Sequence, residues 1–149
     1  MESKFNFKNF SIVIPIFNEE EILEESTNAI FSLCKRMEID FEIIFSENGS
    51  TDKTKAIAEE LTNKHPEIKI ISNPEPNYGN ALKTGFEIAK NDLVISFDID
   101  YYSESFLSEA LKLESEYSGI TASKRLGSSE DGRRFIRRLA TNFFVILLK

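Results

Sequence analysis

The sequence lacks several features that would place a protein in a specialised class. Among its 149 residues there are one cysteine, Cys34, and no tryptophan. A single cysteine excludes an internal disulfide framework and is compatible with a reducing compartment. No run reaches the roughly 18 apolar residues that span a bilayer. The charged start "MESKFNFKNF" lacks the apolar core of a signal peptide. We therefore expect one compact domain located in the cytoplasm.

The charge of the chain is unevenly distributed. The formal net charge is −7, which argues against nucleic acid as the main partner. Residues 124–149 nevertheless carry seven basic and two acidic side chains, a net charge of +5, which leaves −12 on the preceding 123 residues. A basic end on an acidic body predicts a local anionic target.

Short apolar runs alternate with segments of helical spacing along most of the chain. Strands are expected at residues 10–17, 41–45, 68–72, 93–97 and 118–123, and helices at residues 19–38, 51–64, 81–90, 103–116 and 133–149. This alternation predicts an α/β fold, Rossmann-like, with a mostly parallel sheet and helices on both faces. The crossovers should be right-handed.

The C-terminal segment is a separate part of this expected organisation. We expect one domain over residues 1–149, with the core sheet and helices in 1–123 and a basic segment and apolar helix in 124–149. The sequence stops on "FFVILLK", and six consecutive apolar residues at a terminus need a partner. Our interpretation is that the natural protein continues; the alternative is a terminal helix docked on the sheet.

Two aspartates follow the fourth expected strand in "LVISFDIDYY". Asp98 and Asp100 are one residue apart, so on an extended chain their side chains point to the same side. Ligands of open α/β sheets bind beyond the carboxyl ends of the strands. Hard carboxylate oxygens there suit Mg²⁺ or Mn²⁺, which also binds substrate phosphates. The alternative is that both aspartates are solvated turn residues, or that one of them caps the next helix.

Four segments occur in a fixed order: "SIVIPIFNEEE", "SENGSTDKT", "NYGNALKTGFEIA" and "LVISFDIDYY". At these intervals they resemble the family 2 glycosyltransferases, which have the GT-A nucleotide-sugar-binding fold. The resemblance covers roughly residues 10–126. The later "ASKRLGSSEDGRRFIRRLATN" resembles the arginine-bearing segment of the polyprenyl-phosphate branch, the dolichyl-phosphate mannose or glucose synthases. The resemblance implies a metal-dependent inverting glycosyltransferase that uses a nucleoside-diphosphate sugar.

The resemblance also implies roles for individual positions. The residues implied to bind the nucleotide sugar are Pro15, Phe17, Glu19, Glu47, Asn48, Lys83 and Asp98. Asp98 and Asp100 are the implied metal ligands, and Asp100 and Arg125 are the implied catalytic residues. The residues implied to bind the acceptor phosphate are Arg133, Arg134 and Arg137. Phe17 stands where the family commonly has tyrosine, and Asn48 replaces an acid. Tyr102 stands where the branch often has a glutamine or histidine that helps to hold the metal. A structural role is the alternative at some of these positions. For Pro15 in particular, that role is to end a strand.

The acceptor is inferred from the lack of a candidate for the catalytic general base. No residue after the metal pair stands out as the general base that a hydroxyl acceptor needs. A lipid monophosphate needs none, because its second pKa is about 6. We therefore expect a polyprenyl phosphate at the cytoplasmic membrane face, held by arginines. The alternatives are a glycan hydroxyl acceptor and, in a different class, a phosphorelay receiver domain, whose phospho-accepting aspartate should close the third strand.

Overall fold

The structure, a computed structural model, describes residues 7–112. These residues form β1 (Asn9–Ile16), α1 (Leu23–Arg36), β2 (Asp40–Glu47), α2 (Thr54–Lys64), β3 (Ile68–Ser72), α3 (Tyr78–Ile88), β4 (Val94–Ser96) and α4 (Glu104–Ala110). All of them belong to the first of two compact units, which spans residues 1–117. Two expected elements lie outside the described residues, the strand at 118–123 and the helix at 133–149. The four assigned arginines also lie outside them: Arg125, Arg133, Arg134 and Arg137.

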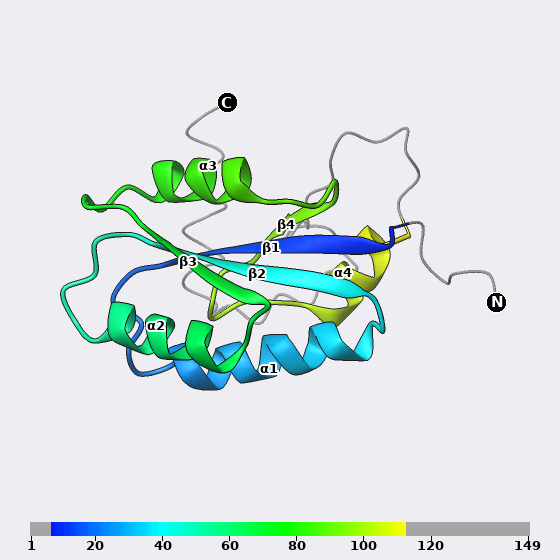
Figure 1. Ribbon diagram of the computed structural model, residues 1–149, viewed down its shortest axis with the longest axis horizontal. Helices are drawn as coiled ribbons and strands as arrows, with labels where there is room; N and C mark the ends of the chain where they lie inside the picture. The colour runs from blue at the N-terminus through cyan, green and yellow to red at the C-terminus, as the bar shows by residue number, and fades with distance from the viewer. Residues whose placement is uncertain (1–6, 113–149) are drawn as a thin grey trace, which may run out of the picture. The chain divides into compact units, whose positions relative to one another are not determined.

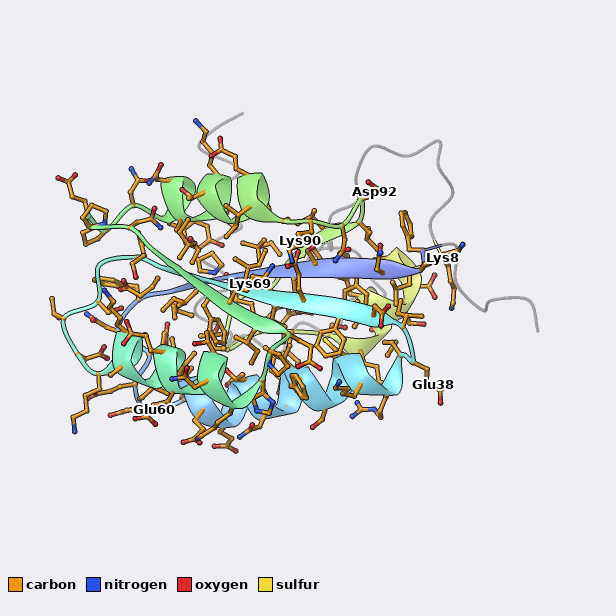
Figure 2. All side chains as sticks on the ribbon, viewed as in Figure 1. Lys8, Glu38, Glu60, Lys69, Lys90 and Asp92 are labelled. Atoms are coloured by element: carbon orange, nitrogen blue, oxygen red, sulfur yellow. The ribbon has the colours of Figure 1, made fainter. Side chains whose placement is uncertain are left out.

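The four described strands form one parallel sheet in the order β3-β2-β1-β4. Figure 1 shows α3 on one face of this sheet and α1 and α2 on the other, which confirms the predicted α/β class. Because all four strands are parallel, their carboxyl ends share one edge, the carboxyl edge, and their starts share the amino edge. Lys8 and Glu38, which precede β1 and β2, are labelled at the amino edge in Figure 2.

The two faces of the sheet are packed differently. On the face of α1 and α2, alternate β1 residues enter a large apolar core, among them Phe10, Ile12 and Ile14. On the opposite face α3 lies close to β1, because its Gly85 has no side chain. A Cβ on Gly85 would stand 2.3 Å from Val13 Cγ1, so any other residue there would push the helix away.

Two helices begin later than the sequence predicts. The helix expected from residue 19 begins at Leu23, because Asn18 adopts a left-handed φ of 54° and redirects the chain. The helix expected from residue 51 begins at Thr54, whose backbone N–H donates to Asp52 Oδ1 at 2.9 Å. Ser50, which precedes this helix, accepts a hydrogen bond from the Asn18 backbone N–H at 3.1 Å.

One helix begins earlier than expected. The segment before residue 81 reads as a loop, but α3 starts at Tyr78. Asn77 has extended backbone angles, and its side chain accepts the backbone N–H of Asn80 at 2.9 Å, which is the geometry of a helix N-cap. As a result the first turn of α3 lies closer to the carboxyl edge than the sequence suggests.

Candidate functional site

The carboxyl edge brings together the residues assigned to the nucleotide and the metal. Glu47 ends β2, residues 17–19 follow β1, and Asp98 and Asp100 follow β4. The chain passes from β1 to β2 and β3 on one side, and then places β4 on the other side of β1. This reversal makes the gap between the ends of β1 and β4 the topological switch point, where open α/β sheets bind ligands.

Pro15 is a buried residue of β1 and helps to release β4 at this point. The Ile16 carbonyl accepts the Asn48 N–H on the β2 side, so the nitrogen of Pro15 faces β4. Proline has no N–H to donate, and the ladder between β1 and β4 ends at the pair Val13↔Ser96. The chain after β4 is therefore free to turn, and the turn carries the two aspartates.

The loops after β1 and β2, residues 17–20 and 50–54, are joined by reciprocal hydrogen bonds. Asn18 donates its backbone N–H to Ser50 Oγ at 3.1 Å, and its Oδ1 accepts the Thr51 N–H at 2.9 Å. Glu20 accepts the Lys53 N–H at 2.9 Å and donates its own N–H to Asp52 Oδ2 at 3.2 Å. We call these two segments the paired loops. The first of them includes Phe17, which is 40% exposed.

Glu19 lies close enough to three aspartates for their charges to affect it. Partial burial, then repulsion from Asp100, Asp52 and Asp98, raises the pKa of Glu19 above its ordinary value. Asp98 and Asp100 are exposed, whereas Phe97 and Ile99 are buried. The chain turns here, because the Tyr101 N–H donates to the Asp98 carbonyl at 3.0 Å, so this segment is not the extended chain for which the same-side placement was predicted. That placement stays a prediction.

Within residues 7–112, neither Glu19 nor either aspartate takes part in an ion pair. Uncompensated hard oxygens fit a divalent cation. The same residues contain no ready-placed group of three or more metal-binding side chains. A cation bound by Asp98 and Asp100 would therefore need further ligands from phosphate or water, as Mg²⁺ commonly does.

Glu47 and Asn48 are both buried and bonded within the protein. Glu47 Oε1 accepts the backbone N–H of Ser50, three residues later. Asn48 Oδ1 accepts the backbone N–H of Asn77 at 2.7 Å, which ties the end of β2 to the start of α3. The asparagine that replaces a family acid thus positions a neighbouring loop. The contact of Glu47 and Asn48 with a nucleotide base stays a prediction.

Tyr78 is a site residue that the sequence did not reveal. It is the first residue of α3, it is 54% exposed, and its hydroxyl donates to Asp98 Oδ1 at 3.0 Å. Burial, followed by the hydrogen bond and charge of Asp98, raises the pKa of Tyr78. The available signal was Asn77, a favoured N-cap residue directly before the "YGNALKTG" segment.

Two other residues discussed above, Lys83 and Tyr102, make contacts elsewhere in the structure. Lys83 points into solvent on α3, and its Nζ lies 3.8 Å from Glu87 Oε1 in an i,i+4 pair. Tyr102 packs against the apolar core, which gives its ring a structural role. No helix within residues 7–112 is both long and apolar enough to cross a membrane.

A second polar cluster lies at the amino edge, beside a pocket of about 370 Å³. The buried carboxylate of Glu42 accepts hydrogen bonds from Lys69 Nζ at 2.6 Å, the Lys90 backbone at 2.7 Å and Ser11 Oγ at 2.8 Å. Burial opposes ionisation of Glu42, but these donors hold its pKa below the ordinary value. Lys69 and Lys90 are labelled near each other in Figure 2. The sequence patterns did not predict this cluster.

Curated relatives share moderate identity with part of the chain. It is 37% identical over 92 residues to an undecaprenyl-phosphate 4-deoxy-4-formamido-L-arabinose transferase of Proteus mirabilis, which covers 60% of this chain and 28% of the relative. The enzyme of the same name from Pseudomonas fluorescens is 38% identical over 94 residues, covering 60% of this chain and 27% of the relative. The chain therefore spans under a third of the length of these relatives.

Solved structures share the fold. A mannosyltransferase of Pyrobaculum calidifontis in complex with GDP-Man and Mn²⁺ has a TM-score of 0.57 and 21% identity, covering 66% of this chain and 30% of that one. S. aureus TarS in complex with UDP-GlcNAc has a TM-score of 0.56 and 24% identity, covering 68% and 30%. The profile of Glycosyl transferase family 2 matches residues 11–146, and the chain therefore belongs to that family.

Proposed function

We propose that this chain contains the nucleotide-sugar-binding part of a metal-dependent inverting glycosyltransferase whose acceptor is a polyprenyl phosphate. The observation that carries the proposal is the convergence of Glu19, Asp98 and Asp100 at the switch point of a family 2 domain, where none of them has a cationic partner within residues 7–112. Phosphate groups do not bind to bare carboxylates, so a cation must join the two.

Five of the assigned residues form the nucleotide and metal subsites in this proposal. The exposed ring of Phe17 would pack on the base or ribose, and Glu47 and Asn48 would line the inner end of that subsite. Asp98 and Asp100 would hold Mg²⁺ or Mn²⁺, which when bound neutralises the charge of the departing diphosphate. A solved relative in fold contains Mn²⁺, which supports this choice of cofactor.

The acceptor assignment has two supports. The curated relatives are named as undecaprenyl-phosphate sugar transferases. In addition, the sequence offers Arg125, Arg133, Arg134 and Arg137 as cations for a phosphate. An ionised lipid phosphate can attack the sugar carbon without a general base, while arginine guanidinium groups hold it by paired hydrogen bonds. The protein would then work peripherally at the cytoplasmic membrane face.

The family match argues against a phosphorelay receiver, and so does β3, which ends at Ser72 without an aspartate. A glycan hydroxyl acceptor remains the runner-up within the class.

The test is a transfer assay with the full chain, Mn²⁺ and a panel of UDP- and GDP-sugars. Undecaprenyl phosphate and a soluble oligosaccharide serve as competing acceptors. We expect radiolabelled sugar to enter the lipid fraction only when the divalent cation is present. Transfer to the oligosaccharide alone would favour the runner-up. Nucleotide binding without any dependence on Mn²⁺, measured by calorimetry in parallel, would contradict the metal-dependent mechanism.

A further inference from the structure

The start of α3 is tied to two strand ends at once. The Asn77 backbone N–H donates to Asn48 at the end of β2, at 2.7 Å, and the next residue, Tyr78, donates its hydroxyl to Asp98 after β4, at 3.0 Å. Asn77 also caps the helix, and Gly85 lets the helix lie against Val13 of β1. Tyr78 is therefore carried on a segment that is fixed at its start and along its length.

The hydrogen bond from Tyr78 makes the two oxygens of Asp98 unequal. Oδ1 accepts the phenol, whereas Oδ2 accepts no hydrogen bond in the part of the chain that the structure describes. A cation that used both oxygens of Asp98 would have to displace the phenol from Oδ1. A cation that used Oδ2 alone would leave the hydrogen bond intact.

We infer that Tyr78 is a positioning residue that restricts Asp98 to one-oxygen contact and so favours Mn²⁺ or Mg²⁺ over Ca²⁺. Ca²⁺ accepts six to eight oxygens and commonly takes both oxygens of a carboxylate, at about 2.3–2.6 Å. Mg²⁺ requires an octahedron at about 2.0–2.1 Å and usually takes one oxygen from each carboxylate. The inference rests on the proposed function, because it assumes that Asp98 meets the cation.

The exposure of Tyr78 suggests a competing role, in which the ring itself contacts the nucleotide. The two roles separate in Tyr78→Phe, which keeps the ring and removes only the hydroxyl. The side chain is 54% exposed and Asn77 still caps the helix in this variant, so the fold should be retained. Its melting temperature should match that of the wild type.

The experiment measures cation binding directly, without turnover. Free Mn²⁺ is followed by electron paramagnetic resonance in the presence of UDP or GDP, and Ca²⁺ is added as the competitor. The variants are Tyr78→Phe, Asp98→Asn and the double mutant. We expect Mn²⁺ to bind about tenfold more weakly to Tyr78→Phe. This is the lower end of the range of losses in metal affinity that follow removal of a hydrogen bond to a metal ligand. Ca²⁺ binding should weaken less, so the preference for Mn²⁺ falls several-fold.

The double mutant tests whether Tyr78 acts through Asp98. If it does, adding Tyr78→Phe to Asp98→Asn changes nothing further. An unchanged ratio of Mn²⁺ to Ca²⁺ affinity in Tyr78→Phe overturns the inference and leaves the proposed function intact. If that unchanged ratio comes with an equal loss of affinity for both cations, the hydroxyl orients Asp98 without selecting between them. Unaltered Mn²⁺ binding in Asp98→Asn would instead overturn the proposed metal site.

Discussion

Two glutamates at opposite edges of the sheet behave in opposite ways. Glu42, at the amino edge, is almost fully buried and is surrounded by donors: the Lys69 ammonium, the Ser11 hydroxyl and a backbone N–H. Its pKa is lowered. Glu19, at the carboxyl edge, is only partly buried, yet burial and three neighbouring aspartates raise its pKa. Burial alone does not decide the state of a carboxylate; its partners do.

This contrast separates a charge with a structural role from one for which we propose a function. At the amino edge the protein supplies every partner that the carboxylate needs, so the cluster is complete without a ligand. At the carboxyl edge, Glu19, Asp98 and Asp100 have no cationic partner among the described residues, which costs stability that a bound metal would restore. Uncompensated charge at one edge and compensated charge at the other is the pattern expected when function is placed on a stable scaffold.

The largest effect should follow from removing a charge at the carboxyl edge. Asp100→Asn keeps the size and hydrogen bonding of the side chain but removes the charge that a hard cation requires. We expect Mn²⁺-dependent nucleotide affinity to fall by about 100-fold or more, beyond the loss typical for residues that only support a ligand. Calorimetric titration of nucleotide with and without Mn²⁺ measures this. Wild-type affinity in the variant, with the fold intact, would show that the acidic pair is structural.

A smaller effect, on stability alone, should follow from breaking the amino-edge cluster. In Lys69→Met the Glu42 carboxylate, 8% exposed, loses its ammonium partner. We expect the free energy of unfolding to fall by about 1–3 kcal/mol, below the value for fully buried pairs because Lys69 is partly exposed. Urea denaturation at neutral pH measures the loss, and nucleotide affinity should not change.

The control for this variant is Lys64→Met, which breaks an exposed pair with Glu24 and should cost less than about 1 kcal/mol. The pH dependence gives a further check. Because the pKa of Glu42 is lowered on folding, its contribution is present above its unfolded pKa of about 4.5 and is lost as pH falls through the folded value. Lys69→Met should weaken that loss; equal stability of the two lysine variants would contradict a structural role for the cluster.

The smallest expected effect is a gain. The pKa of Glu19 is raised on folding, so its ionisation opposes folding once pH rises above the unfolded value of about 4.5. Glu19→Gln removes this cost, and we expect the melting temperature at pH 7 to rise by about 1–3 °C. At about pH 4, where both states are largely protonated, the gain should vanish. Glu21→Gln, at an exposed position nearby, is the control. A gain of the same size in both variants would mean that lower net charge, rather than crowding at the site, is responsible.

The sequence predicted those parts of the molecule that follow from local patterns. β3 has the predicted bounds, and strands alternate with helices along the described residues as the apolar pattern predicts. The role of Glu42 could not be predicted, because "FEIIF" reads as an apolar strand and the partner Lys69 is 27 residues away. The hydrogen bond from Tyr78 to Asp98 spans 20 residues and depends on where α3 begins.

The paired loops have a consequence for the entropy of binding. Five backbone N–H groups, those of Asn18, Glu19, Glu20, Thr51 and Lys53, donate to side chains of the opposite loop. Where a loop at a binding site is ordered only when the ligand arrives, each side chain immobilised costs about 0.5–1.5 kcal/mol of affinity. Here that ordering takes place during folding. A nucleotide entering beside Phe17 would therefore meet backbone that is already in place, and more of its contact energy would remain as affinity.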